Sequence, residues 1–159
     1  MVKRRGLGFS YIEIIFTIAI LALLATAALP YSEVIVTRQK EAALKHSLRE
    51  IRTAIDAYKE AVDEGKVVKL INESGYPRSL DELVLGVINA KDPKKRKIYF
   101  LRRLPRDPMF QDQEVPASKT WGKRSYDSEA ASPKEGADVF DIYSLSEQKG
   151  LNGIPYAQW

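Results

Sequence analysis

Residues 9–29 read FSYIEIIFTIAILALLATAAL, an apolar run in which Glu13 is the one charged residue. At about 1.5 Å per residue, a helix of this length would be roughly 30 Å long, which matches the hydrocarbon core of a bilayer. Lys3, Arg4 and Arg5 precede the run, and basic residues beside an apolar helix favour the cytoplasmic side. The pattern predicts a single membrane pass with the N-terminus in the cytoplasm and the bulk of the chain on the far side.

Glu13 decides between several interpretations of this run. A secretory signal peptide would be cleaved after small residues, such as ATA at 25–27 or AAL at 27–29, and a plain signal anchor would need only the run itself. Neither accounts for a carboxylate, which costs about 2.5–3.5 kcal/mol at mid-membrane and less near the interface. Either Glu13 lies at headgroup depth, or it has a partner.

The residues around Glu13 favour a partner. The string KRRGLGFSYIE at 3–13 resembles the class III signal of type IV pilins and pseudopilins. The resemblance implies a leader, residues 1–8, that prepilin peptidase removes by cutting between Gly8 and Phe9, followed by N-methylation of Phe9. It also implies glutamate as the fifth mature residue, here Glu13, and proline as the twenty-second, here Pro30.

Physical chemistry agrees with what the resemblance implies. Cleavage after Gly8 would leave an ammonium group on Phe9, and in staggered copies that group can meet the Glu13 carboxylate of a neighbour. Either charge alone is costly in a low dielectric, whereas the pair attracts strongly. Glu13 and Pro30 are therefore the expected assembly residues of the transmembrane segment, residues 9–30.

Residues 31–64 predict an amphipathic continuation of the helix. Spacings of 4, 3, 4, 3 and 4 place one apolar stripe on a single face; its members are Leu44, Leu48, Ile51, Ile55, Tyr58 and Val62. We expect this stripe to be buried against the chain's own C-terminal part, with a two-stranded coiled coil as the alternative. Gly65 is the expected C-terminal cap, His46 falls on the solvated side, and Pro30 predicts a kink or local melting near Leu29.

Residues 65–159 alternate short elements with proline and glycine. Ser79 and Glu82 have capping-box spacing, which predicts a helix over 80–89. Residues 139–145 predict a strand, and residues 123–127 are a weaker strand candidate beside it. The expected fold is α+β: a long N-terminal helix, membrane-spanning in its first half and amphipathic in its second, packed against a small antiparallel sheet, as in the pilin fold.

Four motifs of the head narrow the resemblance to the major pseudopilin of type II secretion. They are YP at 76–77, LPRDP at 104–108, WG at 121–122 and DIYSL at 141–145, followed by Trp159. In that family the proline–aspartate–proline element runs straight into tryptophan–glycine, so residues 109–120 resemble an inserted loop. Many type IV pilins carry a disulfide loop, which this cysteine-free chain cannot form.

The resemblance implies a non-enzymatic subunit of a periplasmic pseudopilus, anchored in the inner membrane of a Gram-negative bacterium before assembly. Its expected partners are further copies of itself, prepilin peptidase and methyltransferase, minor pseudopilins and an inner-membrane assembly platform. The alternatives are a type IV pilin of surface fibres for adhesion, motility or DNA uptake, and a membrane-anchored periplasmic enzyme with paired carboxylates.

The same family tends to bind calcium in the loop after its serine–leucine element. Here the loop is residues 146–153, with Ser146, Glu147 and Asn152 as candidate ligands and no other cofactor expected. Calcium takes six to eight oxygens with enough negative charge among them, and this loop has one carboxylate and a lysine. The alternative is a solvated loop held by Trp159.

Charge and composition exclude several other classes. There are 25 basic and 21 acidic residues, but without Lys3, Arg4 and Arg5 the basic count falls to 22, so a nucleic-acid partner is not expected. Absence of cysteine and a single histidine exclude thiolate chemistry and multi-histidine metal sites.

A basic cluster at 91–106 has three interpretations: a DNA-binding surface, a solvated loop, and a contact with acidic residues of a neighbouring subunit, which we favour. The acidic candidates downstream are Asp107, Asp112, Glu114, Asp127, Glu129, Glu135, Asp138 and Asp141.

Overall fold

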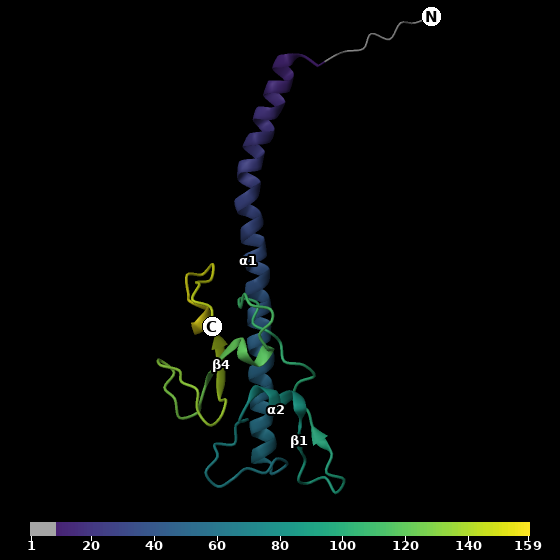
Figure 1. Cartoon of the computed structure of the whole chain (residues 1–159), viewed down its shortest axis with the longest axis vertical. Coiled ribbons are helices and arrows are strands. Elements are labelled where there is room, and N and C mark those ends of the chain that lie inside the picture. The colour runs from purple at the N-terminus through teal and green to yellow at the C-terminus, as the bar shows by residue number, and fades with distance from the viewer. Residues whose placement is uncertain (1–8) are drawn as a thin grey trace, which may run out of the picture. The chain divides into compact units, whose positions relative to one another are not determined.

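The computed structural model describes residues 9–159, apart from the side chains of residues 27–31. The expected leader, residues 1–8 with Gly8, and the side chain of Pro30 lie outside the described residues. The chain divides into two compact units, Met1–Gln39 and Lys40–Trp159, and each is treated by itself. The second unit holds the later part of the long helix together with a mixed head (Figure 1).

A single helix, α1, spans Tyr11–Asp63 and is 53 residues long. Its bounds lie close to the expected helix of residues 9–64. The local melting expected at Pro30 is wrong, because α1 is helical on both sides of this residue and through it. Proline removes one backbone hydrogen bond, but four of the five residues before it, at 25–29, are alanine or leucine, which are strong helix formers that favour continuation.

The C-terminus of α1 ends as the sequence predicts. Gly65 has φ of 69°, a left-handed conformation that glycine adopts without a steric penalty. The Gly65 N–H donates to Val62 O at 2.8 Å, and the Lys66 N–H donates to Ala61 O at 2.8 Å. These two bonds form a Schellman motif, which satisfies the last carbonyl groups of the helix.

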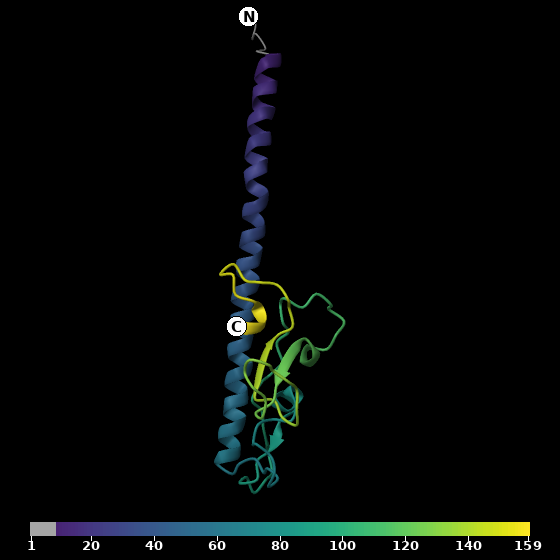
Figure 2. The ribbon, with the colours of Figure 1, turned by 90° about the vertical axis from the view of Figure 1, so that its left-hand side faces the viewer.

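The apolar stripe on the second half of α1 is buried by the chain's own head. All six predicted members are at most 8 % exposed, and they pack with Leu80, Leu83, Trp121, Ile142 and Tyr156 of the head. Figure 2 shows the head covering one side of this part of α1 and leaving the opposite side bare. Within the chain, the stripe therefore forms an intramolecular core, as expected.

Helix α2 spans Leu80–Leu85 and is shorter than the expected helix over 80–89. Gly86, with φ of 72°, ends it, and the chain continues into β1, Val87–Ile88. The expected capping box is also wrong: Ser79 makes no side-chain cap bond, and Glu82 Oε2 accepts the Arg78 N–H at 3.1 Å instead. The same Glu82 oxygen also accepts the Tyr58 hydroxyl at 3.3 Å, so this carboxylate joins the start of α2 to α1.

The strands form two small antiparallel pairs. Strand β1 pairs with β2, Lys97–Ile98, while β3, Trp121–Arg124, pairs with β4, Asp141–Ser144, in the register Trp121 to Ser144. Strand β4 lies inside the predicted range 139–145, and β3 begins two residues before the predicted 123. Two short 3₁₀ helices, η1 (Ala117–Lys119) and η2 (Tyr156–Gln158), complete the elements of an α+β head.

Candidate assembly surface

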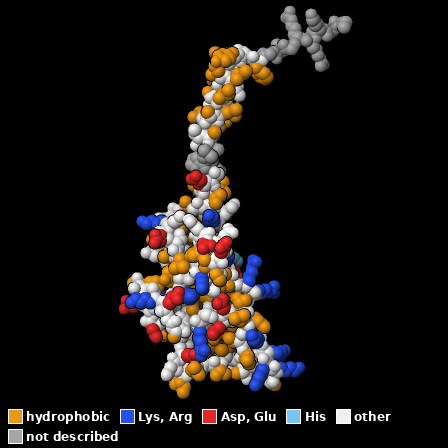
Figure 3. All heavy atoms as spheres, viewed as in Figure 1, with side chains coloured by type: hydrophobic (Ala, Val, Ile, Leu, Met, Phe, Trp, Pro, Cys, Tyr) orange, Lys and Arg blue, Asp and Glu red, His pale blue; other side chains and the backbone are white. Residues whose placement is uncertain are grey.

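The first unit presents an apolar surface on which none of the residues that the structure describes is packed. Residues 9–26 are exposed throughout; Phe9 is 79 % exposed, Ile12 75 % and Leu23 71 %. Thr17 and Thr26 donate their hydroxyls to backbone oxygens one turn earlier, so even these polar groups are satisfied within the helix. Figure 3 shows the resulting hydrophobic covering of this end of α1.

Glu13 is the one carboxylate on this surface. Its side chain is exposed and forms neither a hydrogen bond nor an ion pair with any residue that the structure describes. Phe9, the expected mature N-terminus, is also exposed, and Gly8 lies outside the described range. Among the residues described, no helix is long and apolar enough to cross a membrane.

In the second unit, the head motifs that are far apart in the sequence come together. Trp121 Nε1 donates to Pro105 O at 2.9 Å. Ser144 Oγ donates to Asp107 Oδ2 at 2.6 Å, and the Met109 N–H donates to Asp107 Oδ1 at 2.8 Å. Asp107 is only 2 % exposed. Its buried carboxylate therefore links the 104–108 segment to β4.

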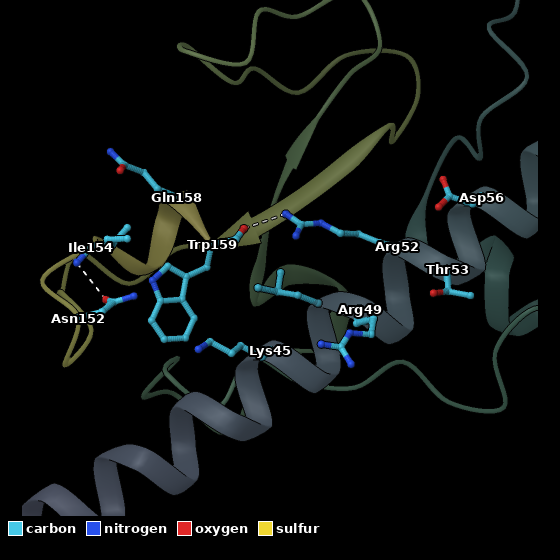
Figure 4. Close-up of a pocket in the computed structure, with 10 residues that line it drawn as sticks. Lys45, Arg49, Arg52, Thr53, Asp56, Asn152, Ile154, Gln158 and Trp159 are labelled. Atoms are coloured by element: carbon cyan, nitrogen blue, oxygen red, sulfur yellow. Dashed lines mark hydrogen bonds between the residues drawn. The ribbon is translucent and has the colours of Figure 1, made fainter.

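Arg52 joins α1 to the end of the chain. Its Nε donates to Asp141 Oδ1 at 2.8 Å, and its Nη2 donates to Ile142 O at 3.1 Å and to Trp159 O at 2.9 Å. Figure 4 shows Arg52 reaching this Trp159 oxygen across an open pocket of about 560 Å³. Lys45 Nζ lies 4.5 Å from the centroid of the Trp159 ring on the same pocket, a cation–π contact.

Tyr58 forms a second link between α1 and the head. Its hydroxyl donates to Glu82 Oε2 at 3.3 Å, and its ring packs on Phe100 with centroids 5.3 Å apart. Burial, together with the charge of Glu82 and the hydrogen bond to it, raises the pKa of Tyr58 to about 12. The protonated tyrosine is therefore part of the folded core.

The three calcium candidates serve turns of their own loop. Ser146 Oγ accepts the Gln148 N–H at 3.3 Å, Asn152 Oδ1 accepts the Ile154 N–H at 3.0 Å, and Glu147 is exposed. No group of three or more acidic or histidine residues that could hold a metal occurs in the described part of the chain. The loop supplies one carboxylate and two side-chain oxygens that already accept backbone N–H groups, and calcium binding there stays a prediction.

Glu41 of α1 holds this loop and was not found from the sequence. Its Oε1 accepts the Leu151 N–H at 2.7 Å and the Tyr156 hydroxyl at 3.1 Å. The interpretation of a loop held by Trp159 is also supported, since a side chain on Gly150 would meet the Trp159 ring at 2.5 Å. Glu41 and Leu151 are 110 positions apart in the sequence, so no local pattern could reveal this contact.

Some cations of the basic cluster at 91–106 form ion pairs or hydrogen bonds inside the head. Arg96 pairs with Asp92, Lys97 Nζ donates to Leu85 O at 3.0 Å, and Arg106 donates to the backbone oxygens of Asp112 and Val115. The remaining cations are largely exposed, and Figure 3 shows Lys and Arg side chains gathered on the side where β1 lies.

Several of the acidic candidates for this contact already have partners in the head, and the contact with a neighbouring subunit stays a prediction. Asp107 binds Ser144, Asp138 accepts from Ser125 Oγ and the Tyr126 N–H, and Asp141 binds Arg52. Sequence proximity could not reveal these contacts, which join residues 12 to 89 positions apart. His46, as predicted, is a solvated helix residue, with its imidazole 79 % exposed.

Comparison with protein-family models, curated proteins and solved structures finds no significant match to this chain.

Proposed function

We propose that this chain is a non-enzymatic structural subunit of a pilus-like filament, of the type formed by the major pseudopilin of type II secretion. The observation that supports the proposal is the exposed apolar surface of residues 9–24, which carries Glu13 as its one charge. Hiding apolar surface from water yields about 25 cal/mol per Å². A surface this continuous is stable in a bilayer or against other copies of itself. A filament subunit lies in the bilayer before assembly and packs against other copies afterwards.

In this proposal the apolar segment anchors the subunit in the inner membrane, and the head lies in the periplasm. The α+β fold of the chain is then a pilin fold. Prepilin peptidase cuts between Gly8 and Phe9, and the new Phe9 amine is methylated. During assembly the Phe9 ammonium of one copy meets the Glu13 carboxylate of a neighbour, which has no other partner among the described residues. Minor pseudopilins and an inner-membrane platform would start and drive growth.

Intact-mass analysis of the protein from its native host tests the processing step. The expected mass lacks residues 1–8 and carries one added methyl group. A full-length or unmethylated N-terminus would contradict the proposal and favour a membrane-anchored protein of another kind.

Substitution of Glu13 tests assembly. We expect Glu13→Ala and Glu13→Lys to abolish filaments seen by electron microscopy, because each removes the partner of the Phe9 ammonium. The matched control is Glu33→Ala, which removes an exposed carboxylate of the same helix outside the apolar run. Normal filaments from either Glu13 variant would refute the ion-pair role.

A clean deletion strain separates secretion from surface fibres. Loss of specific extracellular proteins with fibres intact supports the pseudopilin. Loss of fibres or motility with an unchanged set of secreted proteins would instead identify a type IV pilin.

A further inference from the structure

An open groove runs along one side of α1, beside the segment that follows β2. It consists of two hollows of about 760 Å³ and 740 Å³, which share His46, Glu50 and Arg103 and therefore run into one another. One wall is formed by residues 46–57 of α1, and the other mainly by residues 100–106. We call this feature the arginine groove, because arginines line both of its walls.

The floor of the arginine groove is apolar. Ala54 and Leu101 are buried there, whereas Ala57 and Phe100 are only partly buried, so the floor is open to a ligand. Covering such a floor with apolar groups removes surface from water, which yields about 25 cal/mol per Å². The floor residues of the two hollows are Ala54, Ala57, Phe100, Leu101, Leu104 and Pro105.

Three arginines of the walls have no partner among the residues that the structure describes. Arg49 lies on α1, while Arg102 and Arg103 lie on the opposite wall. All three are exposed, and their side chains form no hydrogen bond, ion pair or cation–π contact within the described chain. Glu50, the one carboxylate among the described lining residues, has its Oε2 atom 3.7 Å from His46 Nε2. Positive charge is therefore in excess around the apolar floor.

An extended acidic peptide matches this combination. Guanidinium groups bind carboxylates through paired, charge-assisted hydrogen bonds. Successive side chains of an extended peptide point to opposite faces, so alternate apolar side chains can cover the floor while the carboxylates between them reach the arginines at the rim. The backbone N–H groups of Arg102 and Arg103 also have no acceptor among the described residues, and they can donate to the carbonyl groups of the peptide.

A nucleic acid fits the arginine groove less well than a peptide. Sequence-tolerant binding of single strands uses open aromatic faces on which bases stack. The ring of Phe100 on the floor already packs on Tyr58, with centroids 5.3 Å apart. An apolar floor without an open aromatic face favours aliphatic side chains over bases.

The exposed acidic loops of this chain do not match the arginine groove. Residues 127–135 read DSEAASPKE and contain no large apolar side chain for the floor. The loop around Asp112 is held by its own head, because Arg106 donates to the backbone oxygens of Asp112 and Val115. A matching segment therefore belongs to another protein.

We propose that the arginine groove binds an extended acidic segment of a different protein. Apolar side chains of that segment cover the floor, and its carboxylates pair with Arg49, Arg102 and Arg103. The inference rests on the second unit alone, so it holds whether or not the chain forms filaments.

Fluorescence anisotropy with synthetic peptides tests the proposal on full-length protein in a non-ionic detergent. The probe is a short labelled peptide of alternating leucine and glutamate, and we expect it to bind saturably. A peptide of alternating serine and glutamate carries the same charge without the apolar side chains and should bind roughly tenfold more weakly. Equal affinity for the two peptides would show charge attraction alone and would overturn the role of the groove.

Charge reversal locates the binding site. R102E/R103E should weaken binding of the leucine–glutamate peptide roughly tenfold or more, because it replaces two carboxylate partners by repelling charges. The matched control is K94E/K95E, which makes the same change in net charge at two exposed lysines between β1 and β2, outside the groove. Urea unfolding followed by tryptophan fluorescence checks that both variants are folded. An equal loss of affinity in the control would overturn the assignment to the groove.

Ala57→Phe tests the floor without a change in charge. Ala57 is only partly buried, so a larger side chain can fill the groove while the head stays folded. We expect roughly tenfold weaker binding of the leucine–glutamate peptide, and unchanged binding would contradict the apolar contact.

Two further probes separate the occupants. A peptide of residues 109–116 of this chain should bind much more weakly than the leucine–glutamate peptide, and equal binding would replace a different protein by a second copy. An oligothymidine that binds more tightly than either peptide, and loses affinity in R102E/R103E, would overturn the peptide in favour of a nucleic acid. A wild-type protein that binds none of these probes would refute the proposal and leave the filament proposal untouched.

Discussion

Replacing Asp107 by alanine should destabilise the head more than any surface change, because this carboxylate is buried and fully used. It is 2 % exposed and accepts the Ser144 hydroxyl at 2.6 Å and the Met109 N–H at 2.8 Å. A hydrogen bond to a charged group contributes about 1.5–3 kcal/mol, and its loss leaves a buried donor unsatisfied. Two such bonds predict a loss of about 3–6 kcal/mol from the free energy of unfolding. For a domain whose total stability is about 5–15 kcal/mol, that loss is severe.

Tryptophan fluorescence is the suitable assay, since Trp121 and Trp159 both lie in the head, whereas circular dichroism would be dominated by α1. Urea unfolding of the full chain in detergent should place Asp107→Ala several kcal/mol below the wild type. Asp107→Asn should lie between them, because an amide oxygen still accepts one bond. Asp127→Ala, an exposed carboxylate of the β3–β4 connection, is the control and should change stability by less than about 0.5 kcal/mol. A loss under about 1 kcal/mol for Asp107→Ala would refute the stabilising role of the buried Asp107 carboxylate.

Three further predictions follow from the head. Because the pKa of Tyr58 is raised to about 12 in the folded protein from its ordinary 10, its stabilising contribution is complete below pH 10 and is lost as pH rises through 12. The shift corresponds to about 3 kcal/mol, so Tyr58→Phe should flatten the fall in urea stability over that range, and an unchanged slope would contradict the assignment. Gly122→Ala should cost about 1–3 kcal/mol, since the new Cβ would lie 2.4 Å from the Tyr143 ring, and Tyr143→Ala should relieve most of it in the double variant. Calcium titration by calorimetry should detect no affinity at millimolar concentrations or below, whereas binding that Glu147→Ala abolishes would revive the candidate site.

Local patterns were sufficient for the helical half of this protein. The stripe from Leu44 to Val62 follows from helical periodicity, and the termination at Gly65 follows from the need for a residue that adopts positive φ. Both are properties of neighbouring residues, so the sequence alone predicted them. The same reasoning failed at Ser79, where the capping-box spacing is present but the Glu82 carboxylate accepts the Arg78 N–H and the Tyr58 hydroxyl instead.

The processing and assembly residues are a separate case. Gly8, Phe9, Glu13 and Pro30 were identified from the sequence, and their roles remain predictions. The exposed apolar surface around Glu13 gives the role of this residue a physical reason, because a carboxylate would be costly there once the surface is buried in a low dielectric without a partner.

What the sequence by itself determined, then, is the long helix, its two contrasting halves and the α+β character of the head. The tertiary structure alone decided how the head closes on the helix. Asp107 meets Ser144 across 37 residues, Arg52 meets Asp141 across 89, and Glu41 meets Leu151 across 110. Helical periodicity and turn propensities act over a few residues, whereas a buried carboxylate or guanidinium takes whichever donors and acceptors the packed core brings within 3 Å.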